Sequence, residues 1–278
     1  MERQETIMRQ SVVQLEKFYA GRLGRLSAIM VMRRLQNLWP HLVGRHILGL
    51  GYAGPFITPY MEAAKSITLA MPAAQGAVVT RSQRGIISTL VDDHRLPFAD
   101  ASFDNVILAH GIEEAVDVQT LLRELWRVTM PEGKIVIIAA HRKGLWAQFD
   151  KTPFGYGRPF SRGQLRRALE QANFIPLLSA GVLYSPPLGF FARPKLSLAT
   201  ERMGETLLPS FSGLIMVEAV KRLYAEQDRG LAERVKAPKR SGAVLPGMAP
   251  TPIDAPSTQA SLKKNHTHSS RHDGAKSS

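Results

Sequence analysis

Three short stretches of the chain carry residues that could bind or activate a ligand. The first is the glycine-rich run 49–54, Gly-Leu-Gly-Tyr-Ala-Gly, at the end of a short apolar segment. Glycine permits a tight turn and lets backbone N–H groups approach a ligand closely. The spacing also fits a dinucleotide site, but such a site requires an acid about 20 residues further on. The chain has Leu-Ala-Met-Pro there, at 69–72. A turn that serves packing alone is the alternative.

Two adjacent carboxylates form the second stretch. Asp92 and Asp93 precede the tripeptide Leu-Pro-Phe at 96–98. Either side chain could accept hydrogen bonds from a ligand, or could simply cap its own loop.

His110 and Glu113 form the third stretch, directly after an apolar segment at 104–109. A histidine titrates near neutral pH and could take a proton from a nucleophile. Lining of a pocket and a structural role are the alternatives for His110. The other histidines are scattered and the chain has no cysteine, so we expect no metal site.

Two further stretches have a plainer interpretation. The aromatic segment 149–160, with Lys151 and Arg158, could hold a flat or anionic ligand, but we favour a packed loop. Arg123, Glu124 and Arg127 are expected to form an exposed charged helical face, in which Glu124 and Arg127 can pair.

Apolar periodicity predicts the elements that must position these residues. Short apolar or β-branched runs predict strands at 46–50, 66–71, 85–91, 104–109 and 134–140, and segment 213–224 could add an antiparallel strand. Amphipathic periodicity predicts helices at 9–38 with a break near Gly21 and Gly24, at 56–65, at 117–130, and from a Ser161 N-cap to Gln171 with a stop at Asn173. Segment 184–212 is expected to be irregular. Alternating strands and helices predict a doubly wound, mostly parallel α/β sheet.

The order of the motifs resembles the class I S-adenosylmethionine (SAM)-dependent methyltransferases, especially the small-domain type with an LPF-x-D-x-SFD signature, here 96–104. The resemblance covers roughly residues 40–145, and more weakly 12–225. It implies a Rossmann-like sheet of seven strands with an N-terminal helical cover. It also implies SAM as cofactor and transfer of a methyl group to an unidentified small-molecule acceptor. The domains expected are a helical cover at 1–40, the α/β domain at 41–228 and a disordered basic tail at 229–278.

The same resemblance assigns the cofactor site. The residues that it implies are Gly49, Gly51, Tyr52, Gly54, Asp92 and His110. In the family, an acid at the position of Asp92 accepts a hydrogen bond from the adenine amino group, and Asp93 is the alternative. His110 is the one candidate for a catalytic role.

Two acids that the family usually has are missing. The first usually stands two residues before the turn glycine that corresponds to Gly51, and this chain has Gly49 at that position. The second usually stands at the end of the second strand, where this chain has Ala70 or Met71. The rival interpretation is therefore a catalytically inactive, methyltransferase-like binding or regulatory protein. Its basic surface would contact nucleic acid or an acidic partner.

Composition sets the remaining expectations. The formal net charge is +13; the part from Lys236 onward has seven basic and two acidic residues, a net +5, which leaves +8 for the rest. This charge fits either an anionic partner, including one bound by the basic tail, or a solvated surface. The N-terminus has no apolar signal segment and no apolar run could span a bilayer. We therefore expect a cytoplasmic enzyme, and no pattern indicates an oligomeric state.

The first prediction concerns the tail. Removal of residues 236–278 should leave the melting temperature unchanged, because this part of the chain lacks periodic apolar residues and is expected to be disordered. Thermal unfolding of the full and the shortened chain checks this. A drop of many degrees would show that the tail packs on the rest of the protein.

Overall fold

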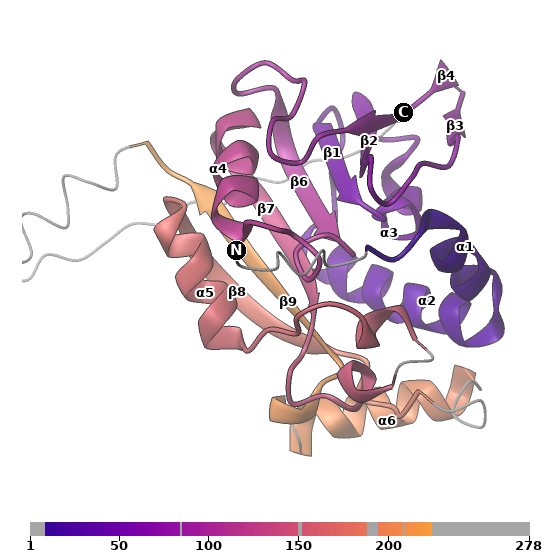
Figure 1. Ribbon diagram of the computed structural model, residues 1–278. Helices are drawn as coiled ribbons and strands as arrows, with labels where there is room; N and C mark the ends of the chain where they lie inside the picture. The colour runs from indigo at the N-terminus through magenta and orange to yellow at the C-terminus, as the bar shows by residue number, and fades with distance from the viewer. Residues whose placement is uncertain (1–8, 84, 150–151, 188–193, 208, 224–278) are drawn as a thin grey trace, which may run out of the picture. The chain divides into compact units, whose positions relative to one another are not determined.

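One seven-stranded sheet organises the protein. The computed structural model describes residues 9–83, 85–149, 152–187, 194–207 and 209–223 (Figure 1). The strands of the sheet are β1 (His46–Gly51), β2 (Ser66–Pro72), β5 (Ser88–Val91), β6 (Phe103–Ala109), β7 (Thr129–Ala140), β8 (Phe174–Val182) and β9 (Leu214–Lys221). Their order is β5-β2-β1-β6-β7-β9-β8. The pairs from β5 to β7 are parallel, and β9 is antiparallel to both β7 and β8. The expected fold class, with its antiparallel strand near the C-terminal end, is confirmed.

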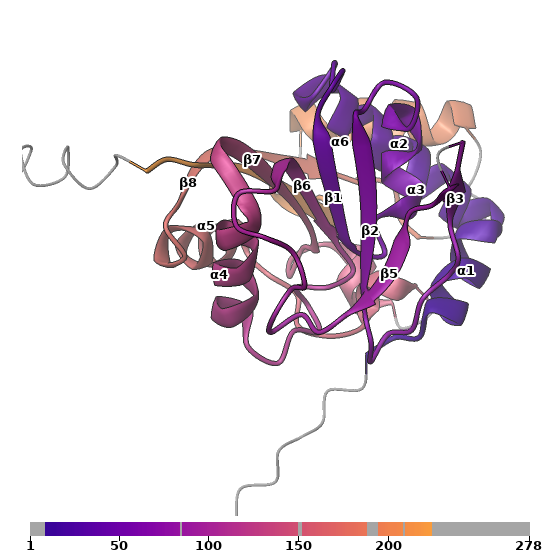
Figure 2. The ribbon, with the colours of Figure 1, turned by 90° about the horizontal axis from the view of Figure 1, so that it is seen from above.

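Helices cover both faces of the sheet (Figure 2). They are α1 (Val12–Ala20), α2 (Arg22–Leu38), α3 (Gly54–Ile57), α4 (Val118–Val128), α5 (Arg162–Gln171) and α6 (Pro194–Leu207). Buried side chains of α1, α2 and α3 share one hydrophobic core with the sheet, and those of α4 and α5 share the other. No helix among the described residues combines the length and hydropathy that a membrane crossing requires.

The alternation of side chains along β7 explains the two cores. Val136 and Ile138 pack with α1 to α3, whereas Ile135 and Ile137 pack with α4 and α5. Successive side chains of a strand point to opposite faces. An uninterrupted apolar run such as that of β7 therefore serves both cores.

Local signals place the helix ends where they were expected. Gly21 separates α1 from α2, and its N–H donates to the Phe18 carbonyl at 2.9 Å. Gly24 lets the two helices pack closely, because a Cβ there would lie 2.1 Å from the Phe18 carbonyl oxygen. Ser161 caps α5 in a capping box, and Asn173 beyond its end has a φ of +64°.

Several elements differ from expectation. The helix expected at 56–65 stops at Ile57 and continues as a 3-10 turn, Thr58–Tyr60, since Pro59 has no N–H to extend the helix. The strand expected at 85–91 is split into β4 (Gly85–Ile86), which pairs with β3 (Arg81–Ser82), and β5. Helix α6 lies within the segment expected to be irregular.

Strand β8 was not predicted. Its Pro176 is tolerated because β8 is an edge strand. The tail expected at 229–278 lies outside the described residues.

Two residues of α4 hold the loop that precedes β6. Arg127 donates to the carbonyls of Leu96 at 2.9 Å and Phe98 at 2.8 Å, and to Asp100 at 2.8 Å. Glu124 accepts the Leu96 N–H at 2.8 Å and pairs with Arg127 at 2.8 Å. The predicted pair is confirmed, but the expectation of a purely exposed face was wrong for these two residues. They satisfy backbone groups of the loop, which need partners once they leave water.

The second prediction tests this support of the loop. Arg127→Met removes the donor to two carbonyls and two carboxylates, and should destabilise the protein by about 2 kcal/mol. The melting temperature should fall by roughly 4–8 °C, given about 2–4 °C per kcal/mol for a unit of this size. Arg123→Met, a neighbouring substitution without these loop contacts, is the matched control and should change it little. Equal shifts for both variants would contradict the interpretation.

Candidate functional site

The carboxyl ends of β1 and β6 bring the glycine turn and His110 together. Gly51 ends β1 with a φ of +76°, and a Cβ at this residue would lie 2.2 Å from the Ala109 carbonyl oxygen. The same oxygen accepts the Tyr52 N–H at 2.8 Å. Only glycine fits here, and the reason is the close approach of β6 rather than the approach of a ligand.

The other two turn glycines have different surroundings. A Cβ at Gly49 would lie 2.5 Å from Ile57 and 2.9 Å from Leu69. An acid at this position would therefore have to displace the ends of these two side chains. At Gly54 the nearest atom to such a Cβ is 3.8 Å away, on Leu69, so this position would accept a side chain.

An aromatic cluster fills the space beside the turn. We use this name for Tyr19, Tyr52, His110 and Phe154. Tyr19 stacks on Tyr52 with ring centroids 5.6 Å apart, and His110 stacks on Phe154 at 4.8 Å. The Tyr19 hydroxyl lies 2.6 Å from His110 Nε2. Phe154 is buried, so the aromatic segment that contains it is a packed loop at this residue, as favoured from the sequence.

Burial sets the protonation of the cluster. It lowers the pKa of His110 to about 3 and raises the pKa of Tyr19 well above its usual value. His110 is therefore neutral at neutral pH, and the Tyr19 hydroxyl donates to its Nε2. With that nitrogen already engaged, the geometry favours a lining role for His110 over that of a general base.

The N-terminal segment 9–20 closes over this end of the sheet. Arg9 pairs with Asp93, the Gln10 N–H donates to Glu114 at 3.0 Å, and the Val12 N–H donates to the Gln75 carbonyl at 2.8 Å. Together with Tyr19, these contacts tie residues of the segment to the acid pair and to the loop after β6.

Asp92 and Asp93 differ in exposure and in their hydrogen-bond partners. The Asp92 side chain is 68% exposed and accepts from the backbone N–H and the ring of His94, which lower its pKa. The Asp93 side chain is only 12% exposed and is held by Arg9. Asp93, the alternative in the sequence analysis, is thus the more buried of the two acids and contacts the N-terminal segment. Asp92, Asp93 and His94 bring three potential metal-ligand atoms within 4.8 Å of one another, but both carboxylates already have protein partners.

Several buried polar atoms around the site have no hydrogen-bond partner. Those between the N-terminal segment and the sheet are Arg9 Nη1, Gln10 Oε1, Gln75 Oε1 and Glu113 Oε2. Glu113 Oε1 accepts the Ala140 N–H at 2.8 Å, and burial raises the pKa of this carboxyl to about 7. Buried polar groups are nearly always paired in proteins, so such a concentration indicates a place where a ligand or water completes the contacts.

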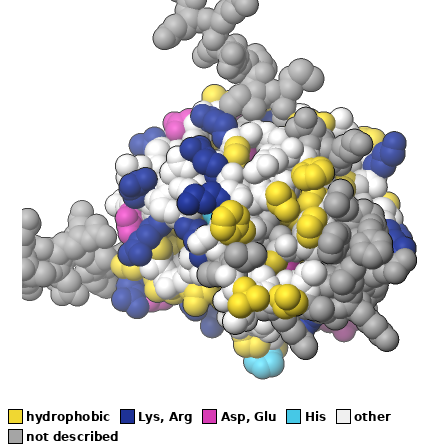
Figure 3. Space-filling view, turned by 90° about the horizontal axis from the view of Figure 1, so that it is seen from below, with side chains coloured by type: hydrophobic (Ala, Val, Ile, Leu, Met, Phe, Trp, Pro, Cys, Tyr) yellow, Lys and Arg dark blue, Asp and Glu magenta, His cyan; other side chains and the backbone are white. Residues whose placement is uncertain are grey.

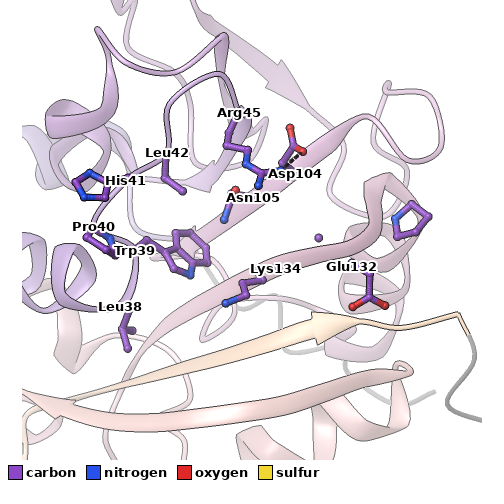
Figure 4. Close-up of a pocket in the computed structure, with 12 residues that line it drawn as sticks. Leu38, Trp39, Pro40, His41, Leu42, Arg45, Asp104, Asn105, Glu132 and Lys134 are labelled. Carbon is purple, nitrogen blue, oxygen red and sulfur yellow. Dashed lines mark hydrogen bonds and ion pairs between the residues drawn. The ribbon is translucent and has the colours of Figure 1, made fainter. Parts of the chain in front are cut away.

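A separate hollow of about 360 Å³ lies at the opposite end of β1, β6 and β7 (Figure 4). Arg45 and Asp104 on its wall form an ion pair at 3.0 Å, and Lys134 pairs with Glu218 at 3.0 Å. Asp104 also accepts the His46 N–H at 2.8 Å and so holds the start of β1. Ligands of open α/β sheets bind beyond the carboxyl ends of strands, so this hollow is not the candidate site.

Comparison with known proteins identifies the family. The methyltransferase domain family matches residues 49–137, which run from the glycine turn through the acid pair and His110 into β7. The fold is similar to that of a SAM-dependent methyltransferase from Thermotoga maritima, with a TM-score of 0.54 and 16% identity over 76% of this chain and 96% of that one. Residues 49–137 thus match the methyltransferase domain family, and the fold is that of the class I SAM-dependent methyltransferases.

Other similar proteins have a lower sequence identity or match a smaller part of this chain. A chain in the complex between the Haloferax volcanii Trm112 methyltransferase activator and a methyltransferase has a TM-score of 0.53 and 14% identity, over 76% of this chain and 92% of that one. A demethylmenaquinone methyltransferase of Mycolicibacterium paratuberculosis is 32% identical over 94 residues, 34% of this chain and 41% of that protein. One from Streptomyces griseus is 47% identical over 49 residues, 18% of this chain and 21% of that protein. The chain thus matches less than half the length of these curated relatives.

The residues at the carboxyl edge fit SAM chemically. The unpartnered atoms comprise one guanidinium nitrogen and three acceptor oxygens. SAM carries a carboxylate for the former, and an ammonium, ribose hydroxyls and an adenine amino group for the latter. Arg9, Gln10, Gln75 and Glu113 would hold these polar groups, Asp93 would add an acceptor beside Arg9, and Tyr52 and His110 would line the pocket.

Sequence analysis missed part of this site. Arg9, Gln10 and Gln75 belong to no motif, and nothing in their neighbourhood along the chain marks them. Tyr19 lies on the buried side of α1, and the hydroxyl of a tyrosine there is the one signal in the sequence that it serves a polar partner as well.

The third prediction compares two turn glycines. Gly51→Ala should lower stability by about 2 kcal/mol or more, because the new Cβ meets the Ala109 carbonyl at a left-handed φ. Gly54→Ala is the matched control and should be nearly neutral. Urea unfolding of both variants gives the free energies. A neutral Gly51→Ala would mean that β1 and β6 separate at little cost.

Proposed function

We propose that this methyltransferase transfers a methyl group from SAM to a nucleophilic oxygen, nitrogen or carbon of a small-molecule acceptor. The observation that supports this best is that the family-matched turn, Asp93 and the aromatic cluster all lie at the carboxyl edge of the sheet, after β1, β5 and β6. When bound, SAM supplies a methyl group activated by its positive sulfonium. The match to demethylmenaquinone methyltransferases is partial, so we propose the acceptor only as a small molecule.

The surroundings suit a cationic methyl donor. His110 is neutral and Tyr19 is protonated, so the cluster adds no positive charge that would repel a sulfonium. The faces of aromatic rings attract cations. Methyl transfer depends mainly on in-line positioning of donor and acceptor in a site without water, which a buried aromatic lining provides.

Glu113 is the group best placed to handle a proton. Its Oε1 is held by the Ala140 N–H, its Oε2 has no partner, and its pKa is raised to about 7 by burial. A carboxylate with that pKa could take a proton at Oε2 from an acceptor hydroxyl or amine as the methyl group is transferred. Acceptors that are already nucleophilic would not need it.

A second function is favoured by two observations. An acid at position 49 would have to displace Ile57 and Leu69, and residues of segment 9–20 occupy contacts that a cofactor would use. Both fit a methyltransferase-like protein that binds a partner without catalysis. Binding of SAM separates the two functions, because the non-catalytic protein has no need of it.

The fourth prediction is a calorimetric titration with SAM and with S-adenosylhomocysteine. Asp93→Asn should weaken SAM binding about tenfold to somewhat over a hundredfold, since a hydrogen bond to a charged group contributes roughly 1.5–3 kcal/mol. Asp92→Asn, whose side chain is exposed, is the matched control and should leave the affinity nearly unchanged.

The outcomes divide clearly. Sensitivity of Asp92 alone would restore the assignment made from the sequence and contradict the structural one. Absence of binding by the unaltered protein at millimolar SAM would contradict the methyltransferase function and support the non-catalytic one. Formation of S-adenosylhomocysteine on addition of a small-molecule extract would establish transfer.

A further inference from the structure

A strongly basic surface surrounds α5. Residues 141–170 contain seven Lys or Arg against two acids. Arg142, Lys143, Arg166 and Arg167 are exposed. Figure 3 shows Lys and Arg side chains gathered on the side of the molecule where α5 lies, next to hydrophobic side chains. The exposed cations among these residues are not used by the site described above.

The cations of this surface lie close together and are poorly neutralised. Lys143 and Arg162 both act on His141, whose pKa is lowered first by burial and then by their charges. Arg166 pairs with Glu170 at 3.0 Å but stays 67% exposed. For Arg142, Lys143 and Arg167, no carboxylate of the described residues lies within ion-pair distance.

A groove between α5 and β8 adds exposed apolar surface to these charges. We call it the α5–β8 groove, a cavity of about 320 Å³ lined by Arg162, Gly163, Arg166, Pro176, Leu177, Leu178, Ser179 and Val217. Leu177 and Leu178 are 46% and 45% exposed. Large aliphatic side chains left in water beside cations indicate a surface that is covered by a partner with both anionic and apolar parts.

We propose that the α5–β8 groove and the surrounding cations dock the protein on an anionic phospholipid surface. The guanidinium and ammonium groups would contact lipid phosphates, and the two leucines would leave water for the interfacial region. A nucleic acid would use the cations but leave the leucines in water. Addition of a partner strand to the edge of β8 is disfavoured, since Pro176 lacks an N–H and cations flank the edge.

The basic surface begins at the carboxyl edge of the sheet. Arg142 and Lys143 follow directly on Ala140, the last residue of β7, so the basic surface begins at the carboxyl edge that also holds the candidate site. Docking would thus place that edge next to the lipid. The proposal stands without the methyltransferase activity, because it concerns only binding.

The fifth prediction uses co-sedimentation of the full chain with phospholipid vesicles. Binding is expected with mixed phosphatidylcholine–phosphatidylglycerol vesicles, and little with phosphatidylcholine alone. The triple variant Lys143→Gln, Arg166→Gln, Arg167→Gln should bind at least about tenfold more weakly, given roughly fivefold per cation near an anionic surface and the partial pairing of Arg166. The matched control removes one Lys and two Arg from the exposed surface of α1 and α2, as Lys17→Gln, Arg22→Gln, Arg33→Gln. It should lose only a small part of the binding.

A second variant tests the contribution of the two exposed leucines to vesicle binding. Leu177→Ser with Leu178→Ser keeps every charge and should still weaken vesicle binding several-fold, most clearly at high salt, where the electrostatic part is screened. Circular dichroism establishes that each variant is folded. Equal losses in the two triple variants, binding unaffected by the leucine changes, or retention by nucleic acid with none by vesicles would each overturn the proposal.

Discussion

The site depends on the close approach of the ends of β1 and β6. The Ala109 carbonyl accepts the Tyr52 N–H at 2.8 Å. Residue 51 must be glycine, because its φ is left-handed and a side chain would meet the Ala109 carbonyl. This contact sets Tyr52 and His110 on neighbouring turns. The aromatic cluster then forms by the addition of Tyr19 from α1 and Phe154 from a loop beyond β7. A change at the turn would therefore displace groups contributed by four separate parts of the chain.

The burial that builds the cluster also decides its chemistry. Desolvation keeps His110 neutral and Tyr19 protonated, and it raises the pKa of Glu113 toward neutrality. The same burial leaves polar atoms of Arg9, Gln75 and Glu113 without partners. Such groups are costly in a folded protein, and their concentration at one edge of the sheet is what marks the candidate site.

The LPF-x-D-x-SFD signature acts here mainly as a support for the site. Phe103 is buried and meets Phe98 edge to face at 5.2 Å, and Asp104 holds the start of β1 through the His46 N–H. Arg127 and Glu124 on α4 bind the backbone of the same loop. The motif therefore holds the segment next to Asp93 in place. Its residues act as structural support and take no part in a chemical step.

The sequence by itself determined the alternation of strands and helices, the burial of β7 on both faces, the antiparallel β9, the Ser161 cap and the family. These depend on side-chain periodicity and on residues a few positions apart. Only the tertiary structure decided that Asp93 rather than Asp92 is buried, that Ile57 and Leu69 pack against Gly49, and that Arg9 and Tyr19 contact Asp93 and His110. Arg9 meets Asp93 across 84 positions and Tyr19 meets His110 across 91. Contacts between such distant residues leave no local pattern, because they arise from how the helices pack on the sheet.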